Sequence, residues 1–380
     1  MPNRDANRIG YLDGLRGVAI ATVILFHAYA RWADIVPYHD QFAHIALFQY
    51  GFLGVELFFL ISGFVILMTL EKCDKFSTFM LRRWLRLFPA SLFVSLAIFA
   101  TAPLFPERPA GAPHALDLLS GLLFIRPGWL SALLHRNVGQ IEGVYWSLYA
   151  EVVFYFVFGA LYFLLGEARA LIAMTGAFLA AMAANFAQVL PDKLMTSLGV
   201  MYWGWFMVGA LMYRWSKLQD GRQALFAAAL AALCPFTLWN APDPGAGTKI
   251  LVVLVISVFF LATMSERAQA ILGHRALLVL GFVSYPLYLL HENLMVALIV
   301  KLGRAAPWIP AALLPVAPIA TVLLLAWLVA RYVEPAMRNA LRPLYLLMCR
   351  IARADPGRLG AADRPPKRRE ALEPAHAITL

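Results

Sequence analysis

Residues 52–70 read FLGVELFFLISGFVILMTL, a stretch in which Glu56 is the only ionisable side chain. A helix rises about 1.5 Å per residue, so roughly 20 such residues cross the hydrocarbon core of a bilayer. Apolar stretches of this kind recur along almost the whole chain and predict about ten transmembrane helices. The ten stretches are 17–30, 52–70, 87–102, 144–165, 171–189, 200–213, 224–239, 250–264, 276–300 and 311–333.

The composition supports the same fold class. The chain has 380 residues, of which 61% are hydrophobic and 14% are charged, whereas a soluble domain has about 25% charged residues. We therefore expect an all-α, polytopic integral membrane protein, with a transmembrane domain over residues 1–340. Residues 341–380 are basic and rich in proline, which predicts a disordered cytoplasmic tail. The three cysteines are widely spaced, so the sequence indicates neither a disulfide framework nor a metal site.

The positions of the basic residues predict the orientation. If the ten stretches cross the membrane in turn, 24 of the 32 Lys and Arg residues fall on the side of the N-terminus, ten of them from Arg331 onward. Basic residues favour the cytoplasmic side, so both termini are expected in the cytoplasm. This distribution explains the net charge of +10 without nucleic acid as a partner. The alternative for the first stretch is a cleavable signal peptide, but Asp13, Arg16 and His27 interrupt its apolar character.

Residues 105–143 differ from the spans, because they are rich in Pro and Gly and apolar only at 116–125. They predict a long external loop with an amphipathic or re-entrant piece. The sequence shows no internal repeat, which weakens a secondary-transporter interpretation that rests on duplicated halves.

Several ionisable side chains lie within the apolar stretches. Each costs about 2.5 to 3.5 kcal/mol at the centre of an inserted helix, so each is a functional candidate. The rise per residue places one group from each of four stretches in the outer half of the membrane. These four are His27, Glu56, Glu151 and His291, and Glu292 follows His291 directly.

A second group, of basic residues, lies at the cytoplasmic face. Arg16 and the cluster that includes Arg83 and Arg86 offer guanidinium groups, which suit phosphates. Arg83 and Arg86 are three residues apart and are expected on one helix face. The alternative is that these residues, like Lys72 and Lys75, only fix the topology of a cytoplasmic loop.

Structural roles are the alternative for the other candidates as well. A lone histidine such as His27 is often a core residue with satisfied hydrogen bonds, and Glu56 would then only pair with an arginine. Ser284, Tyr288 and His291 would only form hydrogen bonds between helices, and Trp146 would mark the membrane interface.

Six groups of sequence motifs occur in order along the chain, from about Ile9 to Pro335. They are Tyr11–Gly17 (YLDGLRG) with Leu25–His27 (LFH), Gly51–Phe64 (GFLGVELFFLISGF), Phe79–Pro89 with its RRWLR, Trp146–Glu151 (WSLYAE) with Phe154 and Tyr155, Ser284–Tyr288 (SYPLY) with His291, and Glu334-Pro335. Taken together, these segments are highly specific, and with them the chain resembles the acyltransferase-3 family of bacterial membrane O-acyltransferases.

The resemblance implies an acyltransferase of the bacterial inner membrane that uses acyl-CoA as donor and a carbohydrate or other hydroxylated acceptor. It also implies that Arg16, the arginine before His27, and the pair Arg83 and Arg86 matter for activity. One departure is Glu56, where the family usually has Asp, so its charge is kept but its geometry is in doubt. Further residues in the matching segments are expected to support the site, namely Asp13, Glu56, Trp146, Tyr155, Ser284, Tyr288 and His291.

Acyl transfer needs a base for the acceptor hydroxyl, and we assign this role to His27. Glu151 is expected to orient the ring as a triad carboxylate does, while Arg16, Arg83 and Arg86 hold the donor phosphates. Whether His27 acts as base or briefly carries the acyl group stays open. No tightly bound cofactor and no metal are expected; the partners are acyl-CoA, a cell-surface or lipid-linked carbohydrate, and membrane lipids. The alternatives are acylation of a small metabolite such as a macrolide, and a non-catalytic glycan or lipid transporter.

Overall fold

The computed structural model describes residues 9–189, 195, 197–238 and 246–351, and within these ranges the regular structure is entirely helical. The predicted all-α class is confirmed. The α-helices are α1 (Gly10–Tyr29), α2 (Ala46–Gln49), α3 (Gly54–Leu70), α4 (Phe76–Thr101), α5 (Asp117–Leu123), α6 (Pro127–Leu134), α7 (Trp146–Leu165), α8 (Glu167–Phe186), α10 (Trp203–Leu218), α11 (Gly221–Ala231), α12 (Ala246–Met264), α13 (Glu266–Leu272), α14 (Arg275–Ala305), α15 (Val316–Leu328), α16 (Glu334–Ala340) and α17 (Arg342–Ile351). A π-helical turn at Val329–Val333 joins α15 to α16.

The described residues contain nine helical segments that are long and apolar enough to cross a membrane, or ten if the bent pair α5 and α6 is one span. The prediction of about ten membrane helices is therefore confirmed. Nine of the predicted stretches fall on these nine segments. The remaining stretch, 200–213, corresponds to α10, which has 16 residues and packs along α3.

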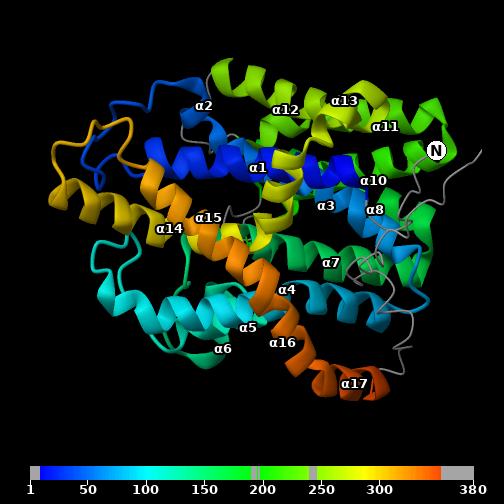
Figure 1. Cartoon of the computed structure of the whole chain (residues 1–380). Coiled ribbons are helices and arrows are strands. Elements are labelled where there is room, and N and C mark those ends of the chain that lie inside the picture. The colour runs from blue at the N-terminus through cyan, green and yellow to red at the C-terminus, as the bar shows by residue number, and fades with distance from the viewer. Residues whose placement is uncertain (1–8, 190–194, 196, 239–245, 352–380) are drawn as a thin grey trace, which may run out of the picture.

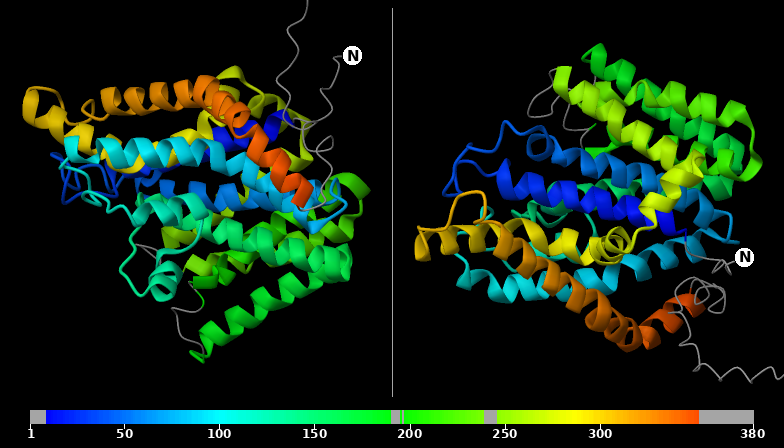
Figure 2. Two further views of the ribbon diagram at one scale, coloured as in Figure 1. Left: turned by 90° about the horizontal axis from the view of Figure 1, so that it is seen from below. Right: turned by 45° about the horizontal axis from the view of Figure 1, so that its top comes forward.

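Most of the long helices lie side by side with roughly parallel axes, and α15 and α16 cross them obliquely, as Figures 1 and 2 show. The start of α1 and the helix α17 lie at the same end of the bundle, which we call the N-terminal end. The opposite end carries the connections 30–45, 105–116 and 306–315, and we call it the loop end. His27, near the last residue of α1, is therefore close to the loop end.

Small residues allow the central helices to approach closely. A Cβ added at Gly17 on α1 would overlap the carbonyl oxygen of Leu277 on α14, and one at Gly281 would overlap the carbonyl oxygen of Asp13. Close backbone contact at small residues is a usual way for membrane helices to associate. This contact fixes α1 against α14 along most of its length.

The predicted external loop contains the bent pair α5 and α6, whose axes differ by 120°. The bend follows Phe124, which has a left-handed backbone conformation at φ 56°. A bent pair of this kind is either a broken span or a re-entrant loop, so the re-entrant piece stays a prediction.

The predicted tail is partly helical. Residues 342–351 form α17, and Tyr345 and Cys349 of this helix pack against Leu81 of α4. The expectation of a disordered segment from residue 341 is wrong for this stretch, because these apolar side chains are buried against α4. The rest of the predicted tail lies outside the described residues.

Candidate active site

His27 lies in the last turn of α1 with its side chain buried against α14. Its Nδ1 is 2.9 Å from the carbonyl oxygen of Val23, one turn earlier on α1, and 3.3 Å from Nε2 of His291. The two imidazole rings meet edge to face with their centroids 4.8 Å apart. His291 was expected at the same depth as His27, and the structure places the two rings in contact.

The partners of the two rings allow their tautomers to be assigned, because a carbonyl oxygen only accepts hydrogen bonds. Nδ1 of His291 is 3.0 Å from the carbonyl oxygen of Tyr288, so this nitrogen carries the proton and Nε2 is the acceptor. The Nδ1–H of His27 then donates to the carbonyl of Val23 and to Nε2 of His291. The lone pair of His27 Nε2 is thereby left to accept a proton.

The carboxylate beside His27 belongs to Glu292, which follows His291 on α14. Its Oε1 is 3.6 Å from Nε2 of His27, and its Oε2 accepts a hydrogen bond of 2.9 Å from the backbone N–H of Val144. Gly143 makes this approach possible, because a Cβ at that residue would lie 2.6 Å from Oε2 of Glu292. A carboxylate at this position can stabilise the imidazolium that forms when Nε2 takes a proton.

Glu151 does not occupy the expected position beside His27. Its Oε1 accepts hydrogen bonds of 2.6 Å from the hydroxyls of Ser62 and Tyr155. The expected contact between Glu151 and the His27 ring is not present, because α14 and not α7 packs along α1. The structure places Glu292 in that position and leaves Glu151 in a separate polar site on α7.

A cavity of about 420 Å³, which we call the outer cavity, lies next to His27, between α1, α3, α14 and the loop of residues 105–143. Glu56 and Glu292 contribute carboxylates to its wall, and Arg31 contributes a guanidinium group. The pairing of Glu56 with an arginine, the alternative considered from sequence, does not occur among the described residues. The aromatic side chains in the wall are Phe26, Trp32, Phe52, Trp146 and Tyr288. Such a mixture of flat apolar surfaces and a few polar groups is typical of small-molecule sites.

An inner cavity of about 70 Å³ lies toward the N-terminal end and is lined by Arg16, Arg86 and Glu151, among others. Val55 and Tyr288 line both cavities, so these two side chains form the boundary between them. The single polar layer expected from sequence is therefore divided. His27 and Glu56 line the outer cavity, His291 is buried against the His27 ring, and Glu151 lines the inner cavity.

The three candidate arginines have different surroundings. Arg16 forms an ion pair of 2.8 Å with Asp13 and lines the inner cavity together with the exposed Arg86. Arg83 is buried, donates a hydrogen bond to the hydroxyl of Thr69, and lies with its guanidinium carbon 5.4 Å from the ring centroid of Tyr155. The structure thus brings Arg16 and Arg86 to one cavity and places Arg83 behind it.

Tyr288 links the site to the start of α7. Its hydroxyl donates a hydrogen bond of 2.9 Å to the carbonyl of Val144 and is 2.7 Å from the hydroxyl of Ser147. Ser284, in contrast, donates to the carbonyl of Gly281 within its own helix. Tyr288 therefore has both a place in the wall of each cavity and the structural hydrogen bonds considered as the alternative.

A polar network between the loop of residues 105–143 and α14 was not expected from the sequence. Arg108 and Glu142 form a buried ion pair with Nη2 and Oε1 3.3 Å apart, and the other oxygen of Glu142 accepts hydrogen bonds from the side chain and backbone of Asn293. The Oδ1 of Asn293 accepts from the backbone N–H of Ala110 at 2.9 Å. Burial raises the pKa of Glu142 to about 8, although the guanidinium of Arg108 opposes this shift. The sequence feature that could have indicated this network is the polar run His291, Glu292 and Asn293 within an apolar stretch.

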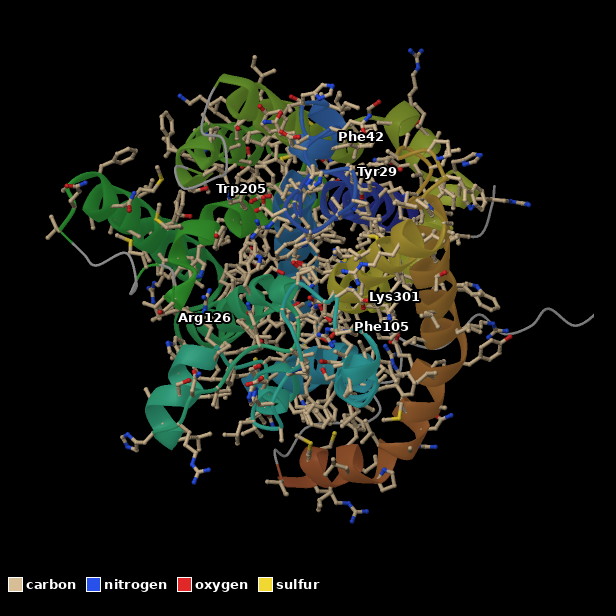
Figure 3. All side chains as sticks on the ribbon, turned by 90° about the vertical axis from the view of Figure 1, so that its left-hand side faces the viewer. Tyr29, Phe42, Phe105, Arg126, Trp205 and Lys301 are labelled. Atoms are coloured by element: carbon tan, nitrogen blue, oxygen red, sulfur yellow. The ribbon has the colours of Figure 1, made fainter. Side chains whose placement is uncertain are left out.

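A second contact holds the same loop at the rim. Glu107 pairs with Lys301 at 3.4 Å and with Arg304 at 3.2 Å, and the Lys301 ammonium lies 5.8 Å from the ring centroid of Phe105. Figure 3 looks onto the loop end and shows Lys301 and Phe105 next to each other. Together with the Glu142 network, these contacts place the loop over the outer cavity. In the described part of the chain, no group of three or more His, Cys, Asp or Glu side chains is placed to hold a metal ion.

Comparison with known proteins assigns the chain to the family that its sequence motifs resemble. The family model of the acyltransferase-3 family, described as an acyltransferase domain, matches residues 9–331. The chain is 27% identical over 355 residues to "Nodulation protein 10" of Rhizobium leguminosarum bv. viciae, which covers 86% of this chain and 92% of that protein. It is 26% identical over 307 residues to the "Putative membrane-bound transacylase BcsY" of Komagataeibacter xylinus, covering 75% of this chain and 72% of that protein.

A shorter match connects the chain to a much larger protein. It is 29% identical over 160 residues to the "Putative O-acetyltransferase SACOL0978" of Staphylococcus aureus (strain COL), which covers 39% of this chain and 23% of that protein. No solved structure matches. Because the family model matches 85% of the sequence, from residue 9 to residue 331 of 380, the chain belongs to the acyltransferase-3 family of membrane O-acyltransferases.

Proposed function

We propose that the protein transfers an acyl group from acyl-CoA, supplied at the N-terminal end, to a hydroxyl of a carbohydrate bound in the outer cavity. The observation that supports this most directly is the position of His27. Its Nε2 has no proton in the assigned tautomer, and its side chain lines the outer cavity. The inner cavity, with Arg16 and Arg86, meets the outer one at Val55 and Tyr288.

In the proposed reaction, Nε2 of His27 takes the proton of the acceptor hydroxyl as that oxygen attacks the thioester carbonyl. The new C–O bond forms, the C–S bond breaks, and the CoA thiolate leaves with the proton that His27 had taken. Glu292, 3.6 Å from Nε2, stabilises the transient imidazolium. His291 accepts from Nδ1–H and holds the ring in the orientation that presents Nε2 to the acceptor.

The alternative chemistry uses the same nitrogen. If Nε2 of His27 attacks the thioester itself, the acyl group passes through an acyl-imidazole before it reaches the hydroxyl. Glu292 stabilises positive charge on the ring in either route, so both give His27 and Glu292 the same importance.

The orientation follows from the distribution of basic residues. The N-terminal end faces the cytoplasm in this proposal, and the loop end faces outward from the inner membrane of a bacterium. The start of α1 and the helix α17 lie at the same end of the bundle, which supports an even number of crossings. The number is even only if α10 is counted as a span. Acyl-CoA is made in the cytoplasm, so the donor would reach the side on which Arg16 and Arg86 lie.

The acceptor class can be tested in cells. With the gene intact, mass spectrometry of surface glycans and glycolipids should find an acyl group on a hydroxyl, and the corresponding mass should be missing when the gene is deleted. Glycans that are identical in both strains, with loss of acylation from a small hydroxylated metabolite, would support the metabolite alternative instead.

The donor site makes a prediction about three neighbouring arginines. Arg86→Ala should raise KM for acyl-CoA about tenfold or more, because a hydrogen bond to a charged phosphate contributes about 1.5 to 3 kcal/mol. Arg83→Ala should mainly lower thermal stability, since Arg83 is buried against Thr69 and Tyr155. Arg82→Ala is the matched control, because Arg82 is on the same helix but does not line the inner cavity. An unchanged KM for Arg86→Ala would remove this arginine from the donor site.

A further inference from the structure

One carboxyl oxygen of Glu56 has no hydrogen-bond partner among the described residues. The side chain lies in the first turn of α3 and is 3% exposed, and its Oε2 has no hydrogen-bond partner within the described ranges. A buried polar atom without a partner is rare in proteins, and a buried carboxylate without a cation is costly. The expected explanation is a partner that is bound only during function.

The position of Glu56 indicates what that partner is. Glu56 lines the same outer cavity as His27, and the aromatic rings of Phe52 and Trp146 lie in the same wall. Flat rings can cover the apolar C–H faces of a sugar, while carboxylate oxygens accept hydrogen bonds from its hydroxyls. The cavity thus offers one carboxylate beside the reactive histidine and a second one on another helix.

The charges in the cavity limit the acceptor further. The one guanidinium in its wall, that of Arg31, belongs to an exposed residue and lies 4.8 Å from the ring centroid of Trp32. Glu56 and Glu292 are both buried and both supply oxygens. An ionised Glu56 would repel a phosphate or carboxylate held next to it, so in the proposed binding mode the unit beside Glu56 is a hydrogen-bond donor without negative charge.

We infer that Glu56 binds the acceptor by accepting a hydrogen bond from a second hydroxyl of a neutral sugar, and so presents the reacting hydroxyl to His27. This inference rests on the proposed function, because it takes the outer cavity as the acceptor site. Glu56 is then a specificity-determining residue, whereas Glu292 acts on the imidazole. The carboxylate accepts the bond without any covalent change.

Binding and stability together test this role. The purified protein is titrated with methyl β-D-glucopyranoside as a neutral probe and methyl β-D-glucuronide as its anionic counterpart, using tryptophan fluorescence, since Trp32 and Trp146 line the cavity. The wild type should prefer the neutral probe, and Glu56→Gln should weaken its binding about tenfold to hundredfold. The thermal midpoint of Glu56→Gln should be equal or higher, because the substitution removes a buried unpaired carboxyl. The acyl-CoA KM should not change.

The control is Glu71→Gln, at the other end of α3. Glu71 pairs with Lys217 at 2.8 Å and lies outside both cavities, so this variant should bind the neutral probe as the wild type does. Three results would overturn the inference: no binding of the neutral probe by the wild type, equal binding of the glucuronide, or unchanged probe binding by Glu56→Gln. Failure of the proposed function is seen separately, as a wild type that transfers no acyl group from labelled acyl-CoA to endogenous acceptors in membranes.

Discussion

His27→Ala is expected to lower kcat for acyl transfer by about 10² to 10⁴-fold, the usual contribution of a general base. In the proposed reaction, Nε2 of His27 takes the acceptor proton. No other imidazole can replace it, because His27 is the one histidine among the described residues that line the outer cavity. His27→Gln should be as severe, since an amide keeps a polar side chain but does not accept a proton at neutral pH. Both effects are measured with a labelled acyl donor at saturating acceptor.

Two controls separate a chemical effect from misfolding. His44→Ala changes an exposed histidine of the loop end and should leave kcat unchanged. Added imidazole should restore part of the activity of His27→Ala, because the truncated side chain enlarges a cavity that already measures about 420 Å³. A well-folded His27→Ala protein with undiminished transfer would remove His27 from the mechanism.

Glu292→Gln is expected to lower kcat by about 10²-fold or more, because the neutral amide cannot stabilise the imidazolium at Nε2 of His27. The side-chain carbonyl of glutamine can still accept the hydrogen bond from Val144, so the local structure should persist. KM for acyl-CoA should stay near the wild-type value, since Glu292 does not line the inner cavity.

Glu151→Gln is the matched comparison, because it makes the same substitution at the inner cavity, where the Glu151 carboxylate contacts Ser62 and Tyr155. We expect a smaller fall in kcat than for Glu292→Gln. If Glu151→Gln is the more severe of the two, Glu151 and not Glu292 acts with His27, and the catalytic role first assigned to Glu151 stands.

The spans could be predicted from sequence, but the neighbours of the polar residues within them could not. Hydropathy gives the position of Glu151 along the membrane normal, and nothing in it says which helix α7 faces. The contact of α1 with α14 depends on Gly17 and Gly281, whose roles become visible only when both backbones are in place. This contact is what puts His291 and Glu292, more than 260 residues away in sequence, beside His27.

Helical periodicity also could not predict that Arg83 and Arg86 have different surroundings. Residues three apart on a helix differ by about 60° around its axis, which is enough to bury Arg83 against Tyr155 while Arg86 is exposed and lines the inner cavity. The loop network was missed for a different reason. Glu142 and Asn293 are 151 residues apart, and an external loop gives no hydrophobic pattern from which its docking site could be predicted.

The central claim is that an acyl group passes from a donor at the N-terminal end to an acceptor in the outer cavity through His27. The direct test is the purified protein in proteoliposomes of known orientation, with labelled acyl-CoA on the side of the N-terminal end and a membrane-impermeant carbohydrate acceptor on the side of the loop end. We predict labelled acceptor with the wild type and at least about a 10²-fold lower rate with His27→Gln. The claim would be contradicted if transfer required donor and acceptor on the same side, or if the wild type moved the acceptor across the membrane without acylating it.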